Sequence, residues 1–329
     1  MPLLNIIIPV YKARDTLPDT LNSLMAQTRH NFITTIVNDC DGIDYSDIIE
    51  KYRKFLAIKY IVREENGGPG LACQTGLDEN YKSTPMCDYV MFVDADDMLM
   101  PRAVDLLYTE AKKNFADIVS GEILCEKEGQ EAFVIHKDKY LTWRHAKVYR
   151  ARYLQEIGLR FPPEPRVNED SYFNLVAHLL TEKKYGIDEP LYLWRRNLSS
   201  ITRSEEDFHI THNFEYLQAQ VMGARRILKS EYRYKLGPTF FNIYKAYELE
   251  FLFHREELEK SNKLVNELFV MPETFKIFKD ARFIYNLAEF CKQTEFTDGK
   301  LIFYPHSFNS WCGFFGLNIS DIKESEVII

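Results

Sequence analysis

An apolar run at Tyr89–Val93 leads directly into three acidic residues, Asp94, Asp96 and Asp97. Carboxylates at this density repel one another unless a cation lies among them. If the run is a buried strand, Asp94 and Asp96 lie at its carboxyl end, where open α/β sheets bind their ligands. The spacing therefore indicates a site that holds a divalent metal together with a diphosphate. A solvated acidic turn that caps the next helix is the alternative.

A second acidic pair, Glu169 and Asp170, follows Asn168 and precedes a helical pattern of apolar residues at Tyr172–Leu179. Free N–H groups and the helix dipole stabilise a carboxylate in the first turn of a helix, so capping is one explanation. With a metal motif upstream, the chemical interpretation is that Asp170 acts as a general base toward a hydroxyl and Glu169 orients its neighbours.

Polar groups also follow the apolar run Phe32–Val37 and precede an expected helix at Leu71. An ionised Asp39 is acceptor-only and is placed to accept a hydrogen bond from a nucleobase or ribose, while an Asx turn is the alternative. The turn Gly67–Gly70, which includes Gly68, lets backbone approach a ligand closely. Both positions are predicted to contact a nucleotide.

Basic and hydroxyl side chains follow a predicted strand at 190–194. Arg195 and Ser200 could hold a diphosphate through charge-assisted and hydroxyl hydrogen bonds, and a basic solvent loop is the alternative. His209 and His212 come shortly after and could add a metal ligand, although a surface histidine usually has no such role.

The scaffold must bring these strand ends together. Alternating apolar strand patterns and helical patterns over about the first hundred residues predict an α/β fold, a mostly parallel Rossmann-like sheet flanked by helices. The predicted elements are strands at 4–10, 32–37, 58–62, 89–93, 117–125, 131–136 and 190–194, and helices from 17, at 46–56, from 71, at 102–114 and at 146–157. Strand patterns fade after residue 205, so we expect a first domain at 1–205 and a smaller helical C-terminal domain at 206–329.

Composition excludes several classes of protein. A net charge of −8 over 329 residues argues against a general nucleic-acid binder, whose affinity comes from many Lys and Arg side chains. The six cysteines are scattered without metal-site spacing and indicate reduced thiols, hence a cytoplasmic protein. The first residues lack a basic leader pattern, and no apolar run is long enough for an integral membrane segment.

Several motifs in residues 4–202 together resemble the family 2 glycosyltransferases of the GT-A fold. Ile6–Tyr11 resembles the opening strand, Ile36–Gly42 the second-strand motif and Asn66–Ala72 the Gly-rich turn. Asp94–Asp97 resembles the metal-binding DXD motif, and Asn168–Asp170 the catalytic acid pair. In the helix after the Gly-rich turn the family commonly has Arg and Asn, whereas this chain has Cys73 and Gln74, which puts the contacts of that arginine in doubt.

The resemblance implies a metal-dependent, inverting transferase that moves a sugar from a nucleoside-diphosphate donor, with a UDP-sugar expected, to a hydroxyl acceptor. Mn²⁺ or Mg²⁺ is the implied cofactor. Asp96 would be a direct metal ligand, and Asp94 would lie near the ribose or reach the metal through water. The implied site residues are Asp170 and Glu169 for catalysis, Pro9, Tyr11, Asp39, Gly68, Asp94, Arg195 and Ser200 for the donor, and Asp96 and Asp94 for the metal.

Neither the acceptor nor the role of residues 206–329 follows from these motifs. The acceptor could be a glycan, a polymer, a lipid-linked sugar or a nucleic-acid base, and the helical part could shape the acceptor site or a homo-oligomer contact. One alternative function is a sugar-nucleotide nucleotidyltransferase, although Tyr11–Asp15 is not the Gly- and Arg-rich loop that this predicts. Another is a non-catalytic carbohydrate-binding or scaffold protein on the same fold.

Overall fold

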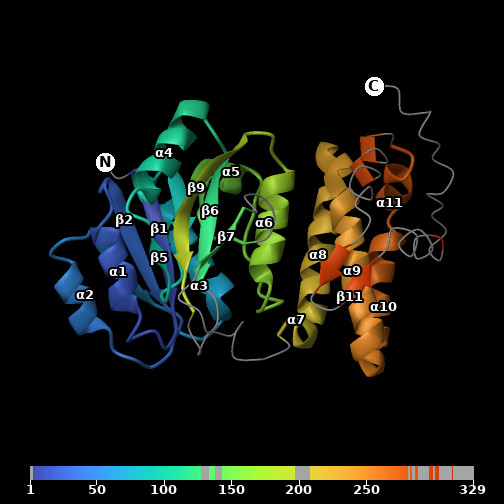
Figure 1. Cartoon of the computed structure of the whole chain (residues 1–329), viewed down its shortest axis with the longest axis horizontal. Coiled ribbons are helices and arrows are strands. Elements are labelled where there is room, and N and C mark those ends of the chain that lie inside the picture. The colour runs from blue at the N-terminus through green and yellow to red at the C-terminus, as the bar shows by residue number, and fades with distance from the viewer. Residues whose placement is uncertain are drawn as a thin grey trace. The chain divides into compact units, whose positions relative to one another are not determined.

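The computed structural model describes residues 3–126, 133–137, 143–196, 208–280 and the short pieces 282–283, 286–287, 296–298, 301–303 and 313. The chain folds into two compact units, Met1–Phe208 and His209–Ile329. Figure 1 shows the sheet in the first unit and mainly helices in the second. Separate roles for residues 1–205 and 206–329 in donor and acceptor binding stay a prediction.

The first unit is built on one mixed sheet. Its strands run in the order β3-β2-β1-β4-β8-β6-β9-β5, with β7 beside β6. The four strands from β3 to β4 are parallel, whereas β8 runs antiparallel to both β4 and β6. The strands are β1 (Leu4–Val10), β2 (Phe32–Asn38), β3 (Ile58–Val62), β4 (Tyr89–Phe92), β5 (Met98–Leu99), β6 (Ile118–Glu126), β7 (Phe133–His136), β8 (Lys147–Arg150) and β9 (Lys184–Trp194).

Both faces of this sheet are covered, as its apolar strands require. The even-numbered side chains of β1 join a core with Leu17, Leu21 and Leu24 of the first helix, whereas Ile7 faces the helix that follows the Gly-rich turn. Phe92, Phe161 and Phe173 fill the same second face with edge-on and stacked rings. The helices are α1 (Leu17–Met25), α2 (Ser46–Tyr52), α3 (Gly68–Lys82), α4 (Ala103–Asn114), α5 (Ala151–Glu156) and α6 (Glu169–Leu179).

The predicted α/β fold is confirmed, and the prediction of a strand at 4–10 matches β1 residue for residue. The helix predicted at 146–157 is wrong in its first half. Residues Lys147–Arg150 form β8, because their backbone pairs with β4 on one side and β6 on the other. Pairing with distant strands overrides local helical preference, and only α5 remains helical.

The second unit is mainly helical. Phe240 lies at its centre, with the rings of Phe269, Phe278 and Phe283 at centroid distances of 5.8, 5.5 and 5.8 Å. Much of the helical pattern predicted beyond residue 280 lies outside the described residues. The elements are α7 (Phe208–Thr211), α8 (Asn213–Ile227), η1 (Glu231–Leu236), α9 (Gly237–Phe253), η2 (Arg255–Glu257), α10 (Leu258–Phe269), α11 (Pro272–Ile277), β10 (Phe296–Asp298) and β11 (Leu301–Phe303).

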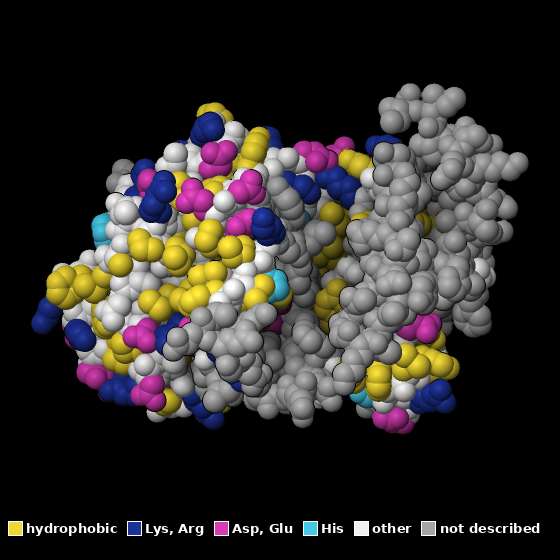
Figure 2. Space-filling model, in the orientation of Figure 1, with side chains coloured by type: hydrophobic (Ala, Val, Ile, Leu, Met, Phe, Trp, Pro, Cys, Tyr) yellow, Lys and Arg dark blue, Asp and Glu magenta, His cyan; other side chains and the backbone are white. Residues whose placement is uncertain are grey.

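The visible surface mixes charges. On the face shown in Figure 2, Lys and Arg side chains are interspersed with Asp and Glu side chains among apolar groups. This arrangement agrees with the net charge of −8 and does not form a broad basic stripe among the described residues of that face. Within the part of the chain that is described, no helix has the length and apolar character needed to cross a bilayer.

Substituting Gly76 tests the packing of α3 on β1. A Cβ at residue 76 would lie 2.5 Å from Cγ2 of Ile7, so Gly76→Ala should lower the free energy of unfolding by about 1–3 kcal/mol despite the better helix propensity of alanine. Urea denaturation measures the change. In an Ile7→Ala background the same substitution should not lower the free energy of unfolding further. A Gly76→Ala protein as stable as the original would contradict this close packing.

Candidate active site

The acidic loop after β4 is fixed to neighbouring elements by hydrogen bonds to backbone and to side-chain groups. Val93 N–H donates to the Ile7 carbonyl over 3.0 Å, which keeps the loop at the carboxyl edge of the parallel strands. Beyond the loop, Leu99 N–H donates to Ser23 Oγ over 3.1 Å. The Gln27 amide donates to the Met100 carbonyl, and its oxygen accepts from the Val104 N–H. Helix α1 therefore holds the far side of the loop in place.

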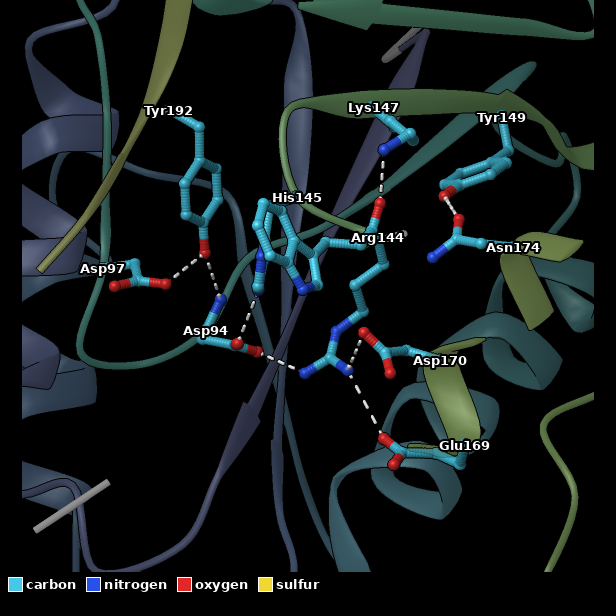
Figure 3. Close-up of polar contacts among 11 residues, drawn as sticks. Asp94, Asp97, Arg144, His145, Lys147, Tyr149, Glu169, Asp170, Asn174 and Tyr192 are labelled. Carbon is cyan, nitrogen blue, oxygen red and sulfur yellow. Dashed lines mark hydrogen bonds and ion pairs between the residues drawn. The ribbon is translucent and has the colours of Figure 1, made fainter. Parts of the chain in front are cut away.

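Asp94 lies between two cationic or polar side chains that are adjacent in sequence. Arg144 Nη2 donates to one carboxylate oxygen over 2.5 Å, and Nε2 of His145 lies 2.9 Å from the other (Figure 3). Burial on its own would raise the pKa of Asp94, but the Arg144 charge and the His145 hydrogen bond outweigh it and lower that pKa. Asp94 is thus a charged carboxylate.

Asp97 is more deeply buried than Asp94. The Tyr192 hydroxyl donates to its carboxylate over 2.7 Å, and the Arg195 N–H donates over 2.9 Å. Burial, together with the charges of Asp94 and Asp96, raises the pKa of Asp97 well above its ordinary value. Asp97 therefore ties the end of β9 to the acidic loop, while Asp96 is only half-buried.

The second acidic pair begins α6 and meets the same arginine. Arg144 Nη1 lies 3.4 Å from Glu169 Oε1 and 4.0 Å from Asp170 Oδ2. Burial, followed by the Asp170 charge, raises the pKa of Glu169 to about 8. The side chain of Glu169 is 5% exposed and that of Asp170 is 16% exposed, so Asp170 is the more accessible group. Acids far apart in sequence thus converge on one guanidinium.

Asp39 shapes the Gly-rich turn. Its carboxylate accepts hydrogen bonds from the N–H groups of Gly67 and Gly68, the latter over 2.7 Å, and from the Asn66 amide over 3.0 Å. It also forms an ion pair with Arg63. The contacts of the Asp39 carboxylate are therefore internal, and it fixes the start of α3 beside the end of β2.

Helix α3 contacts the acidic pair through its small residues. A Cβ at Gly70 would lie 2.4 Å from Glu169 Cγ, so glycine is what admits the Glu169 side chain. Cys73, one turn further on, is fully buried. Gln74 accepts from the Phe161 N–H over 2.9 Å and donates to Asp78 over 2.8 Å. The two positions where the sequence departs from the family pattern are thus packed into the core beside the site.

The remaining predicted donor residues lie at or near the same sheet edge. Pro9 is buried in β1 opposite Val37, and the Asp39 N–H donates to the carbonyl of Val10 over 2.9 Å. Tyr11 is 50% exposed. The Arg195 side chain bonds Asp19 over 2.8 Å. These contacts bring the ends of β1, β2 and β9 toward one edge of the sheet.

Some predicted residues cannot be placed in this site. Ser200 lies outside the described residues, as does the side chain of His209. His212 belongs to the second unit, where its Nδ1 lies 3.9 Å from Glu215. The roles suggested for these residues stay predictions.

Sequence reasoning missed Arg144, His145 and Tyr192. Arg144 and His145 precede β8 in a stretch with no motif, and Tyr192 reads as an ordinary strand residue. The His145 ring packs on Tyr192 at a centroid distance of 4.8 Å, so both belong to one buried cluster. The one available signal was an Arg-His pair immediately before an apolar strand pattern.

Comparison with known proteins agrees with this geometry. Residues 5–167 match the family described as Glycosyl transferase family 2. Residues 5–167 belong to glycosyl transferase family 2. The matched segment contains Asp39, the Gly-rich turn, the acidic loop and Arg144, and it ends just before the acidic pair that begins α6.

Curated relatives of the chain are glycosyltransferases by name. The chain is 28% identical over 225 residues to the uncharacterized glycosyltransferase EpsJ of Bacillus subtilis, covering 61% of this chain and 63% of that protein. It is 25% identical over 224 residues to the poly(ribitol-phosphate) beta-N-acetylglucosaminyltransferase TarS of Staphylococcus aureus, covering 62% and 38%. The chain thus spans less than two thirds of the length of either relative.

Solved structures share the fold. The crystal structure of S. aureus TarS 1–349 in complex with UDP-GlcNAc has a TM-score of 0.61 at 20% identity, over 88% of this chain and 80% of that one. The mannosyltransferase PcManGT from Pyrobaculum calidifontis, in complex with GDP-Man and Mn²⁺, has a TM-score of 0.51 at 14% identity, over 96% and 84%. At these identities the likeness concerns the fold.

The family 2 domain has a donor set that fits a divalent cation. Asp94, Asp97 and His145 each offer a ligand atom, and these atoms lie within 4.8 Å of one another. The raised pKa of Asp97 comes first from burial and then from its charged neighbours, and a cation would relieve that repulsion. A set dominated by carboxylates suits Mg²⁺ or Mn²⁺.

The pH dependence of stability tests the burial of Glu169. Because its pKa is raised to about 8, Glu169 favours the folded state below its unfolded pKa of 4.5, and this contribution is lost as pH rises toward 8. The free energy of unfolding should therefore fall relative to that of Glu169→Gln between pH 5 and 8, by at most about 1.4 kcal/mol per pH unit. Urea denaturation across this range measures it.

The matched control for this prediction is Glu156→Gln. Glu156 is 53% exposed and pairs with Arg152 on the surface, so its carboxylate is hydrated in both states. Its difference from the original protein should stay flat over the same pH range. A flat difference for Glu169→Gln as well would contradict the raised pKa.

Proposed function

We propose that the chain is a metal-dependent, inverting glycosyltransferase that moves a sugar from a nucleoside-diphosphate donor to a hydroxyl acceptor. The observation that carries the proposal is the meeting of Asp94 from the DXD loop with Glu169 and Asp170 from α6 around Arg144. One side of the site would then supply charge for a diphosphate, and the other would supply a base. Family 2 membership of residues 5–167 supports this chemistry.

The metal would be held by the carboxylates of the acidic loop. Asp96 remains our first choice as a direct ligand because the DXD resemblance implies it and its half-buried charge acts on Asp97, a member of the donor set described above. A bound Mn²⁺ or Mg²⁺ would supply positive charge to the leaving diphosphate. Asp97, held by Tyr192 and the Arg195 N–H, fixes the shape of the loop that presents these groups.

Asp170 is the residue we assign as the general base. Its side chain is the more exposed of the pair and lies in the first turn of α6. Glu169, whose pKa is raised to about 8, is mostly protonated at neutral pH and packs against Gly70. A base that deprotonates the attacking hydroxyl fits a single displacement with inversion.

The donor is proposed to be a UDP-sugar that binds along the ends of β1 and β2. Pro9, Tyr11, Asp39 and Gly68 lie there, and Asp39 holds the turn that offers its backbone to the nucleotide. A relative of the same fold was crystallised with UDP-GlcNAc, which supports this class of donor. Arg195 and Ser200 are proposed to contact the diphosphate.

Acceptor choice is proposed to depend on residues beyond the family 2 segment. That segment ends at residue 167, whereas the second unit begins at His209 and is mainly helical. TarS is named for a poly(ribitol-phosphate) acceptor, so a polymer of that chemical class is the first acceptor to test. A screen of nucleotide sugars for thermal stabilisation with Mn²⁺ would identify the donor first.

Removing Asp96 tests the metal role. Asp96→Ala should abolish the stabilisation that UDP-GlcNAc gives in the presence of Mn²⁺, because the cation bridging protein and diphosphate is lost. Thermal unfolding with and without Mn²⁺ measures it, and Asp105→Ala, at an exposed pair with Arg29, is the control. Full Mn²⁺-dependent stabilisation of Asp96→Ala would remove this assignment.

Replacing Asp170 tests the base. Asp170→Asn should keep donor binding and lose turnover by roughly 10²–10⁴-fold, the usual contribution of general base catalysis. Release of UDP from UDP-GlcNAc with Mn²⁺ measures turnover, and titration of the donor measures binding. Glu169→Gln should lose less, and normal turnover by Asp170→Asn would refute the base assignment.

A further inference from the structure

We propose that Arg144 is a positioning residue that fixes the distance between the donor-side carboxylate Asp94 and the base-side pair Glu169 and Asp170. The proposal rests on the proposed transferase function and adds a residue to it. The guanidinium is the group in Figure 3 that contacts both sides of the site: Nη2 reaches Asp94 over 2.5 Å, and Nη1 reaches Glu169 over 3.4 Å.

Breaking these contacts is energetically costly. The Arg144 side chain is 7% exposed, so the loss of its carboxylate partners would leave a buried charge without compensation. The planar guanidinium presents its N–H donors in a fixed fork, which sets the separation of the groups it joins. Asp94 comes from the loop after β4 and Glu169 from the start of α6, so one rigid group spans two elements.

The segment that carries Arg144 is itself held on both flanks. The Trp143 ring packs on Trp194 at 5.2 Å, and the His145 ring packs on Tyr192 at 4.8 Å. Gly121 N–H donates to the Ala146 carbonyl over 2.8 Å, which ties the segment to β6. The guanidinium therefore starts from a fixed backbone, as a positioning role requires.

Cys73 is a second position from which a positively charged side chain could reach the acids around Arg144. It is fully buried on α3, one turn beyond Gly70, which contacts Glu169. Burial raises the pKa of its thiol, and the charges of Arg144, Asp94, Glu169 and Asp170 all act on it. An arginine at position 73 would therefore meet the same carboxylates from the opposite element, which allows a test by exchange.

The test compares Arg144→Ala, Arg144→Lys, Cys73→Arg and the double variant Arg144→Ala/Cys73→Arg. Turnover and KM are measured as UDP released from UDP-GlcNAc with Mn²⁺, and folding is measured by thermal unfolding. Arg150→Ala is the control. Arg150 Nη2 lies 2.6 Å from Asp117 Oδ1, in an ion pair that does not include the acids around Arg144. The control variant should lower Tm while leaving turnover unchanged.

A positioning role predicts a specific pattern. Arg144→Ala should lower kcat by about 10²-fold with KM changed much less, because a misplacement of about 1 Å costs that much. Arg144→Lys should keep Tm close to that of the original and lose kcat by about tenfold, since lysine lacks the fork. Cys73→Arg alone should lower kcat. The kcat of the double variant should be about tenfold above that of Arg144→Ala.

Other outcomes would overturn the inference. Unchanged kcat in Arg144→Lys would show that the guanidinium only stabilises the fold. If Arg144→Ala does not fold, the kcat of Arg144→Lys decides alone. Failure of the proposed function looks different, because the original protein itself would then release no nucleoside diphosphate from any nucleotide sugar with Mn²⁺.

Discussion

The first unit depends on one electrostatic constraint: Asp94, Asp97, Glu169 and Asp170 lie within a buried or half-buried cluster, and acids in such surroundings need a counter-charge or a proton. Arg144 supplies the charge for three of them. Burial, together with neighbouring charges, also raises the pKa of Asp97 and that of Glu169. The placement of β8, which delivers Arg144, is therefore as important to the site as the acidic loop itself.

The sheet topology brings these acids and Arg144 together. Strands β1 to β4 are parallel and end in polar turns at the edge where open α/β sheets bind their ligands. Adding β8 antiparallel to β4 places the residues just before it at the same edge. Arg144 and His145 thus arrive beside Asp94 because the chain approaches the edge from the opposite direction.

Much of this could be predicted from sequence, and the reasons are local. Continuous apolar runs predicted β1 and β4, and the sequence motifs singled out the acids after β4 and at the start of α6, which the structure brings to one guanidinium. Arg144 could not be found in this way, since a single cation carries no periodicity and its partners are defined only by pairing between distant strands. The same long-range pairing turned 147–150 into a strand.

Asp39 illustrates the limit of reasoning from residue type. A carboxylate at a strand end predicts an acceptor for a ligand, yet in the structure both of its oxygens accept from Gly67, Gly68 and Asn66. Arg63 is a fourth donor to this carboxylate, which is 2% exposed, so these partners already take up its acceptor sites and a contact with a nucleotide stays a prediction. Spacing alone does not reveal how many protein N–H groups reach a carboxylate first.

The glycine at position 70 links two segments of the first unit. Because Glu169 Cγ occupies the space that a Cβ would fill, the Gly-rich turn and the start of α6 share one van der Waals surface. A larger side chain at position 70 would therefore displace Glu169 and, with it, the first turn of α6. The two segments can only be redesigned together.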